Sequence, residues 1–135
     1  MNFTEKTHPT QENKEVSASI QKRKVLSSIS NKLRRIREHK VKNAQNENEA
    51  MRWAGFKIND LIMMFLHNPT GNKEFKTFYQ WKKEGKTIIK GSHAALIWGQ
   101  PIAAHSKVMQ ENEEPNEETY KLFPLCYLFS QDQVH

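Results

Sequence analysis

A long segment with apolar residues at helical spacing is the feature that most constrains this chain. In the second half of residues 16–42 the apolar side chains recur at steps of three and four, and the whole set is Val16, Ile20, Leu26, Ile29, Leu33 and Ile36. Such spacing gives an α-helix one apolar stripe, which the rest of the fold must cover. We predict a helix from Val16 to about Lys42. Residues 1–15 are too polar to bury a core and are expected to form a flexible arm.

The next apolar stretch, residues 51–66, is the most hydrophobic of the chain. Gly55 is expected to break or bend it, and the polar residues 43–49 before it read as a linker. Asn59 is a candidate N-cap for a helix that runs to His67, where an Asn-Pro-Thr-Gly-Asn turn follows. We expect this helix to be buried at the centre of the fold.

The sequence pattern changes from helical to strand-like after a third, short helix. Thr77 is its candidate N-cap, and Gly85 suits a left-handed cap at its C-terminal end. Residues 87–89 and 94–98 are rich in β-forming residues and flank a Lys-Gly-Ser-His turn, which predicts a hairpin. In residues 120–129 both the even-numbered and the odd-numbered positions are mostly apolar, so both faces of a strand here would be apolar. This predicts a strand that is central in its sheet or covered on both sides.

The order of these elements, helices first and strands after, predicts an α+β fold. Two or three N-terminal helices would pack on a small antiparallel sheet of about three strands. The chain has 135 residues, the size of one ordinary domain. We therefore expect a single domain over residues 16–135, with an acidic loop at about residues 108–119.

The net charge of +6 is unevenly distributed. Residues 71–107 hold seven lysines against two glutamates, whereas residues 108–135 hold one lysine against six acidic side chains. A basic centre beside an acidic loop favours polyanions as partners, and a solvated surface is the alternative interpretation. The polar face of the long helix is also basic. Arg34, Arg35 and Arg37 are therefore candidates for auxiliary phosphate contacts, unless that face is only solvated.

The residue types that catalysis requires are not grouped along the chain. The histidines are scattered singly, no H-E-x-x-H or glycine-rich nucleotide motif occurs, and Cys126 is the only cysteine. We expect no enzymatic activity, no cofactor, no metal and no small-molecule substrate. One cysteine is consistent with a reducing cytoplasm, and no apolar run approaches the roughly 18 residues that span a bilayer. A cytoplasmic protein without a membrane partner is expected.

Residues 79–98 combine aromatic rings with cationic groups. The candidate nucleic-acid-binding residues of this segment are Tyr79, Trp81, Lys82, Lys83, Lys86, Lys90 and His93. Lysines neutralise phosphates, and aromatic faces stack on unpaired bases at about 1–3 kcal/mol per base, which suits single strands better than duplex. We expect the cationic groups to line a groove, with Tyr79 and Trp81 as stacking residues. The alternative for Trp81 and Trp98 is that they anchor the core.

The strings YQWKKEGKTIIKGSHAALIWGQP and YKLFPLCYLFSQDQV resemble the N-terminal domain of ArdC-like antirestriction proteins from conjugative and mobile elements. That family has a tryptophan-bearing helix, a glycine, a V-x-K-G-E-K-G-x-x-I hairpin, an I-x-W-x-x-P strand and an aromatic strand that ends in F-[DNS]-x-x-Q. The matching positions here are Trp81, Gly85, Ile88, Lys90, Gly91, Ile97, Trp98, Pro101, Phe129 and Gln133. The likeness covers residues 75–135. Ser92, His93 and Ala94 replace the family's Glu-Lys-Gly.

The resemblance implies non-specific binding of single-stranded DNA, in the transfer of mobile DNA and the evasion of restriction. Full-length members add a C-terminal metallopeptidase-like domain with a zinc motif. The likeness does not extend to that domain, so it implies binding and not proteolysis. RNA is an alternative ligand. A protein-interaction module of a mobile element, whose basic helix and acidic loop recognise protein partners, is the alternative function.

Overall fold

A computed structural model of the chain describes residues 11–101 and 114–135. Its elements are α1 (Gln11–Lys42), α2 (Glu47–Gly55), α3 (Ile58–Ile62), the π-helical turn η2 (Met63–His67), β1 (Phe75–Thr77), α4 (Phe78–Lys83), β2 (Ala95–Trp98), η3 (Tyr120–Leu122), β3 (Leu125–Ser130) and η4 (Gln131–Gln133). The three strands form one antiparallel sheet in the order β1-β3-β2. The predicted α+β fold, with helices first and a small antiparallel sheet after, is confirmed.

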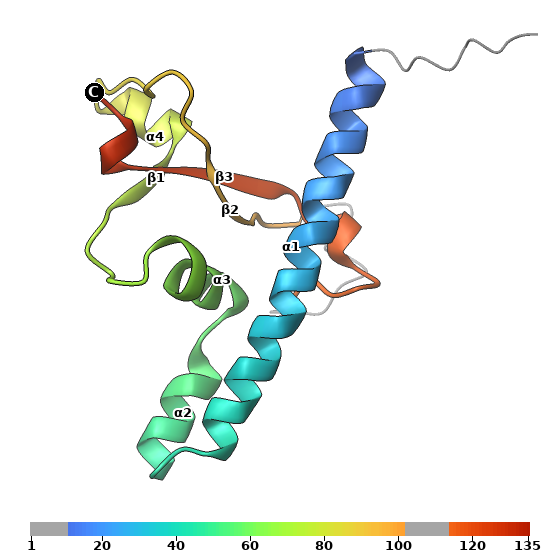
Figure 1. Ribbon diagram of the computed structural model, residues 1–135, viewed down its shortest axis with the longest axis vertical. Coiled ribbons are helices and arrows are strands. Elements are labelled where there is room, and N and C mark those ends of the chain that lie inside the picture. The colour runs from blue at the N-terminus through green and yellow to red at the C-terminus, as the bar shows by residue number, and fades with distance from the viewer. Residues whose placement is uncertain (1–10, 102–113) are drawn as a thin grey trace, which may run out of the picture.

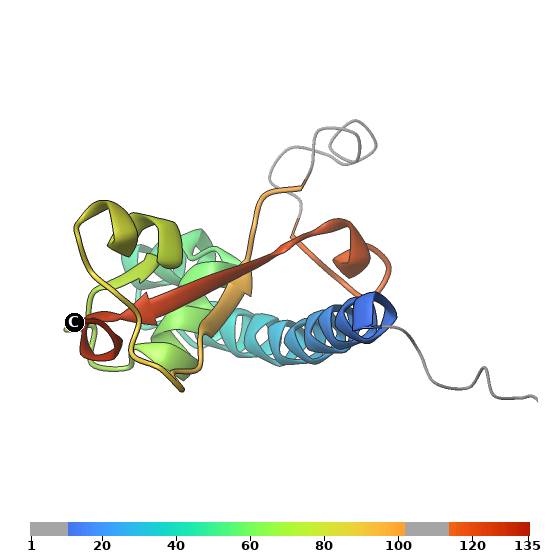
Figure 2. The same ribbon diagram turned by 90° about the horizontal axis from the view of Figure 1, so that it is seen from above.

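The long helix and the short helix α4 lie at opposite sides of the molecule. Figure 1 shows α1 along one side, with β3 running from it to the far end, where α4 and the C-terminus lie. The view from above in Figure 2 shows the same separation. Accordingly, α4 packs against β1 and β3, whereas α1 packs against α2, α3 and η3.

The core lies where α1 and α3 meet the sheet and the segment before β3. Its buried residues are Leu26, Leu33, Ile58, Leu61, Ile62, Trp98 and Phe123. The indole Nε1 of Trp98 donates to Ser30 Oγ at 3.0 Å, so this large ring is buried with its polar atom satisfied. Trp98 is a core anchor, and the expectation that the second apolar stretch supplies the buried centre is confirmed for α3.

Two helix boundaries differ from the prediction. The first helix begins at Gln11, so residues 11–15 are helical and do not belong to a flexible arm; residues 1–10 lie outside the described residues. The linker after α1 is shorter than residues 43–49 because Asn46 caps α2, its side chain accepting the N–H of Glu49 at 2.8 Å. Gly55 ends α2, as expected.

Asn59 does not cap a helix. The N-cap of α3 is Lys57, whose N–H donates to Asp60 at 2.9 Å. The Asn59 side chain instead bonds both main-chain groups of Trp98, with Nδ2 donating to the carbonyl at 2.8 Å and Oδ1 accepting the N–H at 2.9 Å. Since β2 is an edge strand, its outward main-chain groups need such partners. That pairing is non-local, so no local capping pattern reveals it.

The predicted hairpin before β2 is wrong. The first β-rich segment pairs with the C-terminus, through a bridge between Ile88 and Val134, and β2 pairs with β3. The turn itself is present: Ser92 N–H donates to the carbonyl of Ile89 at 3.1 Å, and Gly91 has φ 89°. A positive φ at the third position of a turn is a type II feature, and such turns splay the flanking strands instead of pairing them.

The last strand is shorter than residues 120–129. It begins at Leu125, after η3 and after Pro124, which has no N–H for a sheet ladder. As expected for a strand that is apolar on both sides, β3 is central and pairs with β1 and β2. The edge strand β1 was not expected, because its three residues carry no alternating pattern long enough to read.

Candidate nucleic-acid interface

The short helix α4 is fixed at both ends by its own sequence. Thr77 Oγ1 accepts the N–H of Gln80 at 3.2 Å, and the Gln80 side chain accepts the N–H of Thr77 at 2.9 Å, which is a capping box. At the other end Gly85 has φ 78°, and its N–H donates to the carbonyl of Lys82 at 3.0 Å. Both predicted caps are confirmed, and they set the directions in which α4 projects its side chains.

Trp81 attaches α4 to the sheet and is not a stacking residue. Its side chain is 3% exposed, and its indole Nε1 donates to the carbonyl of Phe129 on β3 at 2.8 Å. The ammonium group of Lys76 lies 4.8 Å from the centroid of its ring. The prediction that Trp81 stacks on bases is therefore wrong. The physical reason is that the large apolar area of an indole favours burial wherever its N–H finds an acceptor.

Two exposed rings stand at the start of α4, and Tyr79 lies on the side opposite Trp81. Phe78 is 55% and Tyr79 is 66% exposed. Residues four apart lie on the same side of a helix, so Phe78 is followed by Lys82, and Tyr79 by Lys83. The ammonium group of Lys83 lies 5.3 Å from the centroid of the Tyr79 ring. These four residues form the α4 face. Sequence reasoning missed Phe78, although it precedes Lys82 by four residues in the same way as Tyr79 precedes Lys83.

Two lysines of the basic run are engaged in ion pairs beside this face. Lys73 pairs with Asp132 at 3.2 Å, and Lys76 pairs with Glu74 at 3.5 Å and with Glu84. The pKa of Lys76 lies above its ordinary value, chiefly because its ammonium group donates to Glu84. As a result, Glu84, which directly follows α4, has Lys76 as its ion-pair partner.

The remaining predicted lysines follow α4 along the chain. Lys86 comes directly after Gly85 and is exposed, so it adds a positive charge close to the end of α4. Lys90 and His93 are also exposed and lie further along, on the loop that pairs with the C-terminal segment; the main-chain oxygen of His93 accepts from the Gln133 side chain at 2.8 Å. Among residues 11–101 and 114–135, the ion pairs do not include Lys82, Lys83, Lys86 or Lys90.

Two hollows in the described part of the chain lie away from the predicted lysines of residues 82–90. One hollow of about 680 Å³ lies between α1 and α2, where Arg37 and Phe56 line it. A second, of about 530 Å³, lies between α1 and β2, with Val25 and Leu66 on its walls. Of the predicted site residues, Arg37 lines the first of these hollows. The α4 face is the outer side of a helix, and it would meet a ligand as a convex surface.

Arg34 and Arg37 are occupied by the acidic loop. Arg37 donates to both carboxylate oxygens of Glu114, at 3.1 and 3.0 Å, and Arg34 Nε lies 3.3 Å from the same carboxylate. Arg34 also donates to the carbonyl of Pro115. Both guanidinium groups are engaged by Glu114, whose single negative charge offsets one of their two positive charges. These ion pairs disfavour the two arginines as phosphate contacts, and that role stays a prediction. Arg35 points elsewhere on α1 and is exposed.

Glu114 is held in its ionised form by these contacts. Burial alone would raise its pKa, but hydrogen bonds and charge from Arg37, together with bonds from Arg34 and the N–H of Ile58, bring the pKa below its ordinary value. The hydrogen bond with Glu114 also raises the pKa of Arg37. The described end of the acidic loop is thus an integral contact of α1 and the start of α3. Residues 108–113 of that loop lie outside the described residues.

Metal-ligating side chains are not clustered in the described part of the chain. Residues 11–101 and 114–135 contain no group of three His, Cys, Asp or Glu side chains that could hold a metal ion. Burial raises the pKa of the Cys126 thiol above its ordinary value, which disfavours the nucleophilic thiolate. No helix within those ranges is long and apolar enough to cross a bilayer.

Comparison with known proteins gives no relative from which a function could be transferred. No protein-family model matches the chain, and neither a curated protein nor a solved structure matches it. The ArdC-like resemblance therefore rests on the residues quoted for it alone. The functional argument rests on the chemistry of the α4 face.

Proposed function

We propose that the chain binds single-stranded DNA, largely without sequence preference, through the α4 face. The observation that carries this proposal is the pair of neighbouring rings, Phe78 and Tyr79, each more than half exposed and each followed by a lysine one helical turn later. Unpaired bases expose aromatic faces that stack on such rings, and the phosphates beside them attract the ammonium groups.

The local architecture supports this use of α4. Trp81 holds the helix on β3 from its inner side, so the rings on its outer side are presented by a fixed element. Stacking is tolerant of sequence because every base has a π-face, and duplex DNA hides those faces within its own stack. The proposal therefore favours single strands over duplex at the α4 face, and it includes no enzymatic step and no cofactor.

The ArdC-like resemblance supports a setting for this binding. Single strands occur during the transfer of mobile DNA, and a protein that coats them could act there or in the evasion of restriction. Nothing in the side chains of the α4 face reads the 2′-hydroxyl group that separates RNA from DNA. Oligouridine is therefore the necessary comparison ligand.

Anisotropy titration of a labelled oligothymidine tests the proposal. The site variant is Lys82→Gln/Lys83→Gln/Lys86→Gln, and a matched control, Lys40→Gln/Lys57→Gln/Lys121→Gln, removes the same charge from exposed positions elsewhere. Each lost phosphate contact makes the slope of log K against log salt shallower by about 0.7 for a single strand, so the site variant is expected to change it by about 2. Equal affinity of the two variants would contradict the proposal.

A further inference from the structure

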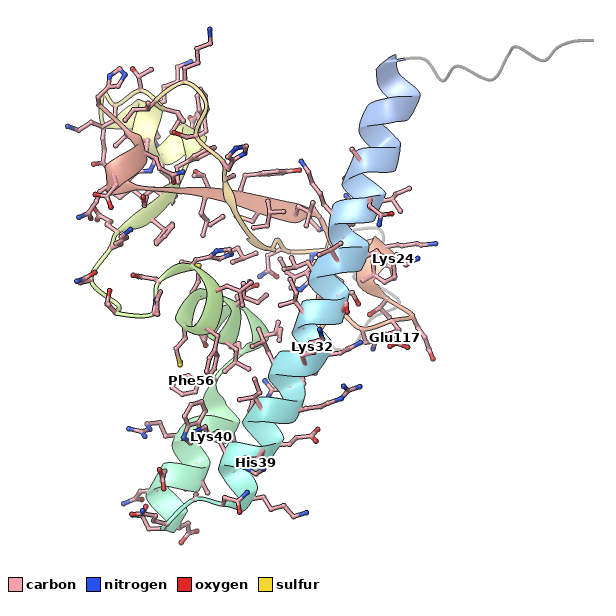
Figure 3. The ribbon with its side chains drawn as sticks, viewed as in Figure 1. Lys24, Lys32, His39, Lys40, Phe56 and Glu117 are labelled. Carbon is pink, nitrogen blue, oxygen red and sulfur yellow. The ribbon has the colours of Figure 1, made fainter. Side chains whose placement is uncertain are left out.

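The outer side of α1 carries a second row of cationic groups. Its cations are Lys24, Lys32, Arg35 and Lys42, and Ser28 and His39 continue the same line, so that exposed residues follow one another at steps of three or four. Since each residue of an α-helix turns the chain by about 100°, these side chains fall within an arc of about 80°. This set is named the α1 stripe. Figure 3 shows Lys24, Lys32 and His39 following one another along the helix.

The stripe faces solvent because the opposite side of α1 is in the core. Leu26, Ser30 and Leu33 are buried, and helical geometry places them roughly opposite the stripe. The row is also straight and stiff, since α1 contains neither proline nor glycine. Between Lys24 and Lys42 the helix rises by about 27 Å.

The charge of the stripe is not cancelled by its described neighbours. Arg34 and Arg37 lie outside the stripe, with Arg37 on the opposite side of α1, and both are engaged by Glu114. The ion pairs among residues 11–101 and 114–135 include none of the stripe's cations. The acidic side chains beside the row are Glu38 and Glu117, and Glu117 accepts a hydrogen bond from Asn31 at 3.1 Å.

We infer that the α1 stripe is a second nucleic-acid surface, which lies along the phosphates of duplex DNA. The stripe contains no Phe, Tyr or Trp ring for unpaired bases, unlike the α4 face. A row of cations about 27 Å long spans the rise of about eight base pairs, and over that length the duplex presents a high density of phosphates that wind around its axis.

An anionic membrane is the less suitable polyanion for this row. A helix that lies on a lipid surface buries its apolar face between the headgroups. In α1 the centre of that face is covered, since Leu26 and Leu33 belong to the core, and of its apolar residues Ile20, Val25 and Ile36 stay exposed. A cationic row with so little free apolar area beside it is better suited to neutralise phosphates than to insert between lipids. Duplex nucleic acid is therefore the partner assigned here.

The two surfaces lie on opposite sides of the molecule, as Figures 1 and 2 show for α1 and α4. One molecule would then bind an unpaired strand at α4 and a duplex at α1, so it would suit a DNA junction at which a duplex continues into a single strand. Binding to such a junction rests on the function proposed for the α4 face. The binding of duplex by the stripe does not.

A crossed experiment tests the stripe. The stripe variant is Lys24→Gln/Lys32→Gln/Arg35→Gln/Lys42→Gln, and its counterpart is Lys82→Gln/Lys83→Gln/Lys86→Gln/Lys90→Gln, so each variant removes four positive charges from exposed positions. Both are titrated with a labelled DNA duplex and with oligothymidine. The stripe variant should bind duplex about tenfold more weakly or worse, with a salt slope shallower by about 3 to 4, and should bind oligothymidine nearly as the wild type does. The counterpart should show the reverse.

The outcomes separate the two proposals. Wild-type duplex affinity in the stripe variant, or equal weakening of both ligands by both variants, would overturn the stripe. An unchanged oligothymidine affinity in the counterpart would overturn only the function proposed for α4. Vesicles of phosphatidylserine and phosphatidylcholine form a third arm, and stripe-dependent vesicle binding without duplex binding would also overturn the inference.

A separate measurement checks that the variants still fold. Lysine, arginine and glutamine have similar helix propensities, so the melting curve by circular dichroism should be retained. If the quadruple variant does not fold, Lys24→Gln/Lys32→Gln and Arg35→Gln/Lys42→Gln replace it, and each should change the duplex salt slope by about half as much. A Lys24→Arg/Lys32→Arg/Lys42→Arg variant keeps the charge and should keep duplex binding; its loss would count against the stripe.

Discussion

The carboxylate of Glu114 joins parts of the chain that are distant in sequence. It accepts from Arg34 and Arg37 on α1 and from the N–H of Ile58 at the start of α3. Its pKa is depressed in the folded state, since these contacts favour the ionised form more than burial disfavours it. A depressed pKa contributes stability above the unfolded pKa, and that contribution is lost as the pH falls through the folded pKa.

Replacing Glu114 tests this linkage. Glu114→Gln should lower the free energy of unfolding at pH 7 by about 1–3 kcal/mol, because two arginines lose their charged partner. The difference from wild type should shrink on acidification below about pH 4.5, where the carboxylate of the unfolded chain becomes protonated. Urea unfolding across this pH range measures it. Glu117→Gln, which alters an exposed contact, should stay within about 0.5 kcal/mol. A pH-independent difference for Glu114→Gln would contradict the linkage.

Residue environments were the hardest part to predict from sequence. Trp81 and Tyr79 both stand close to lysines, and only the position of β3 decides that the indole is buried and the phenol exposed. Arg37 and Glu114 are 77 positions apart, so the neutralisation of a predicted phosphate contact leaves no local pattern. Helical spacing within α4 was the usable signal. It separates Tyr79 from Trp81, whereas Phe78 lies three residues before Trp81 and its exposure follows only from the fold.

At the scale of the elements, helix ends follow local rules and strand partners do not. Thr77 and Gly85 could be predicted as caps because each acts within a few residues of itself. The β-rich segment around Ile88 was recognised as extended, but its partner at Val134 is set by the course of the whole chain. A hairpin prediction assumes that a strand pairs with the next strand in sequence. Here the turn at Gly91 splays the two segments, so they do not pair with each other.

Gly85→Ala tests how far α4 depends on its C-terminal cap. Gly85 has φ 78°, and an added Cβ would meet no atom within 4 Å, so the cost arises from the backbone alone. The free energy of unfolding should fall by about 1–2 kcal/mol. Gly55→Ala is the matched control: it also meets nothing within 4 Å and requires no left-handed backbone, so stability should be kept or increased. Equal urea midpoints for the two variants would contradict this account.

For the whole molecule, the sequence indicated a polyanion partner and the fold distributes the charge. The net charge of +6 predicts such a partner without locating it. Folding pairs Arg34, Arg37, Lys73 and Lys76 with acidic groups, and leaves the α4 face and the α1 stripe at opposite sides. The fold class was predictable because the helical and β-rich halves are separated along the chain. The arrangement of the surfaces was not, because it depends on which charges meet.

The central claim is that unpaired bases stack on Phe78 and Tyr79, and oligothymidine affinity of Phe78→Ala/Tyr79→Ala tests it most directly. Two lost stacking partners at about 1–3 kcal/mol each predict binding at least about thirtyfold weaker than wild type. Met51→Ala, which removes a 65% exposed apolar side chain from α2, should bind as wild type does. Wild-type affinity in the double variant, with its fold intact, would contradict the account.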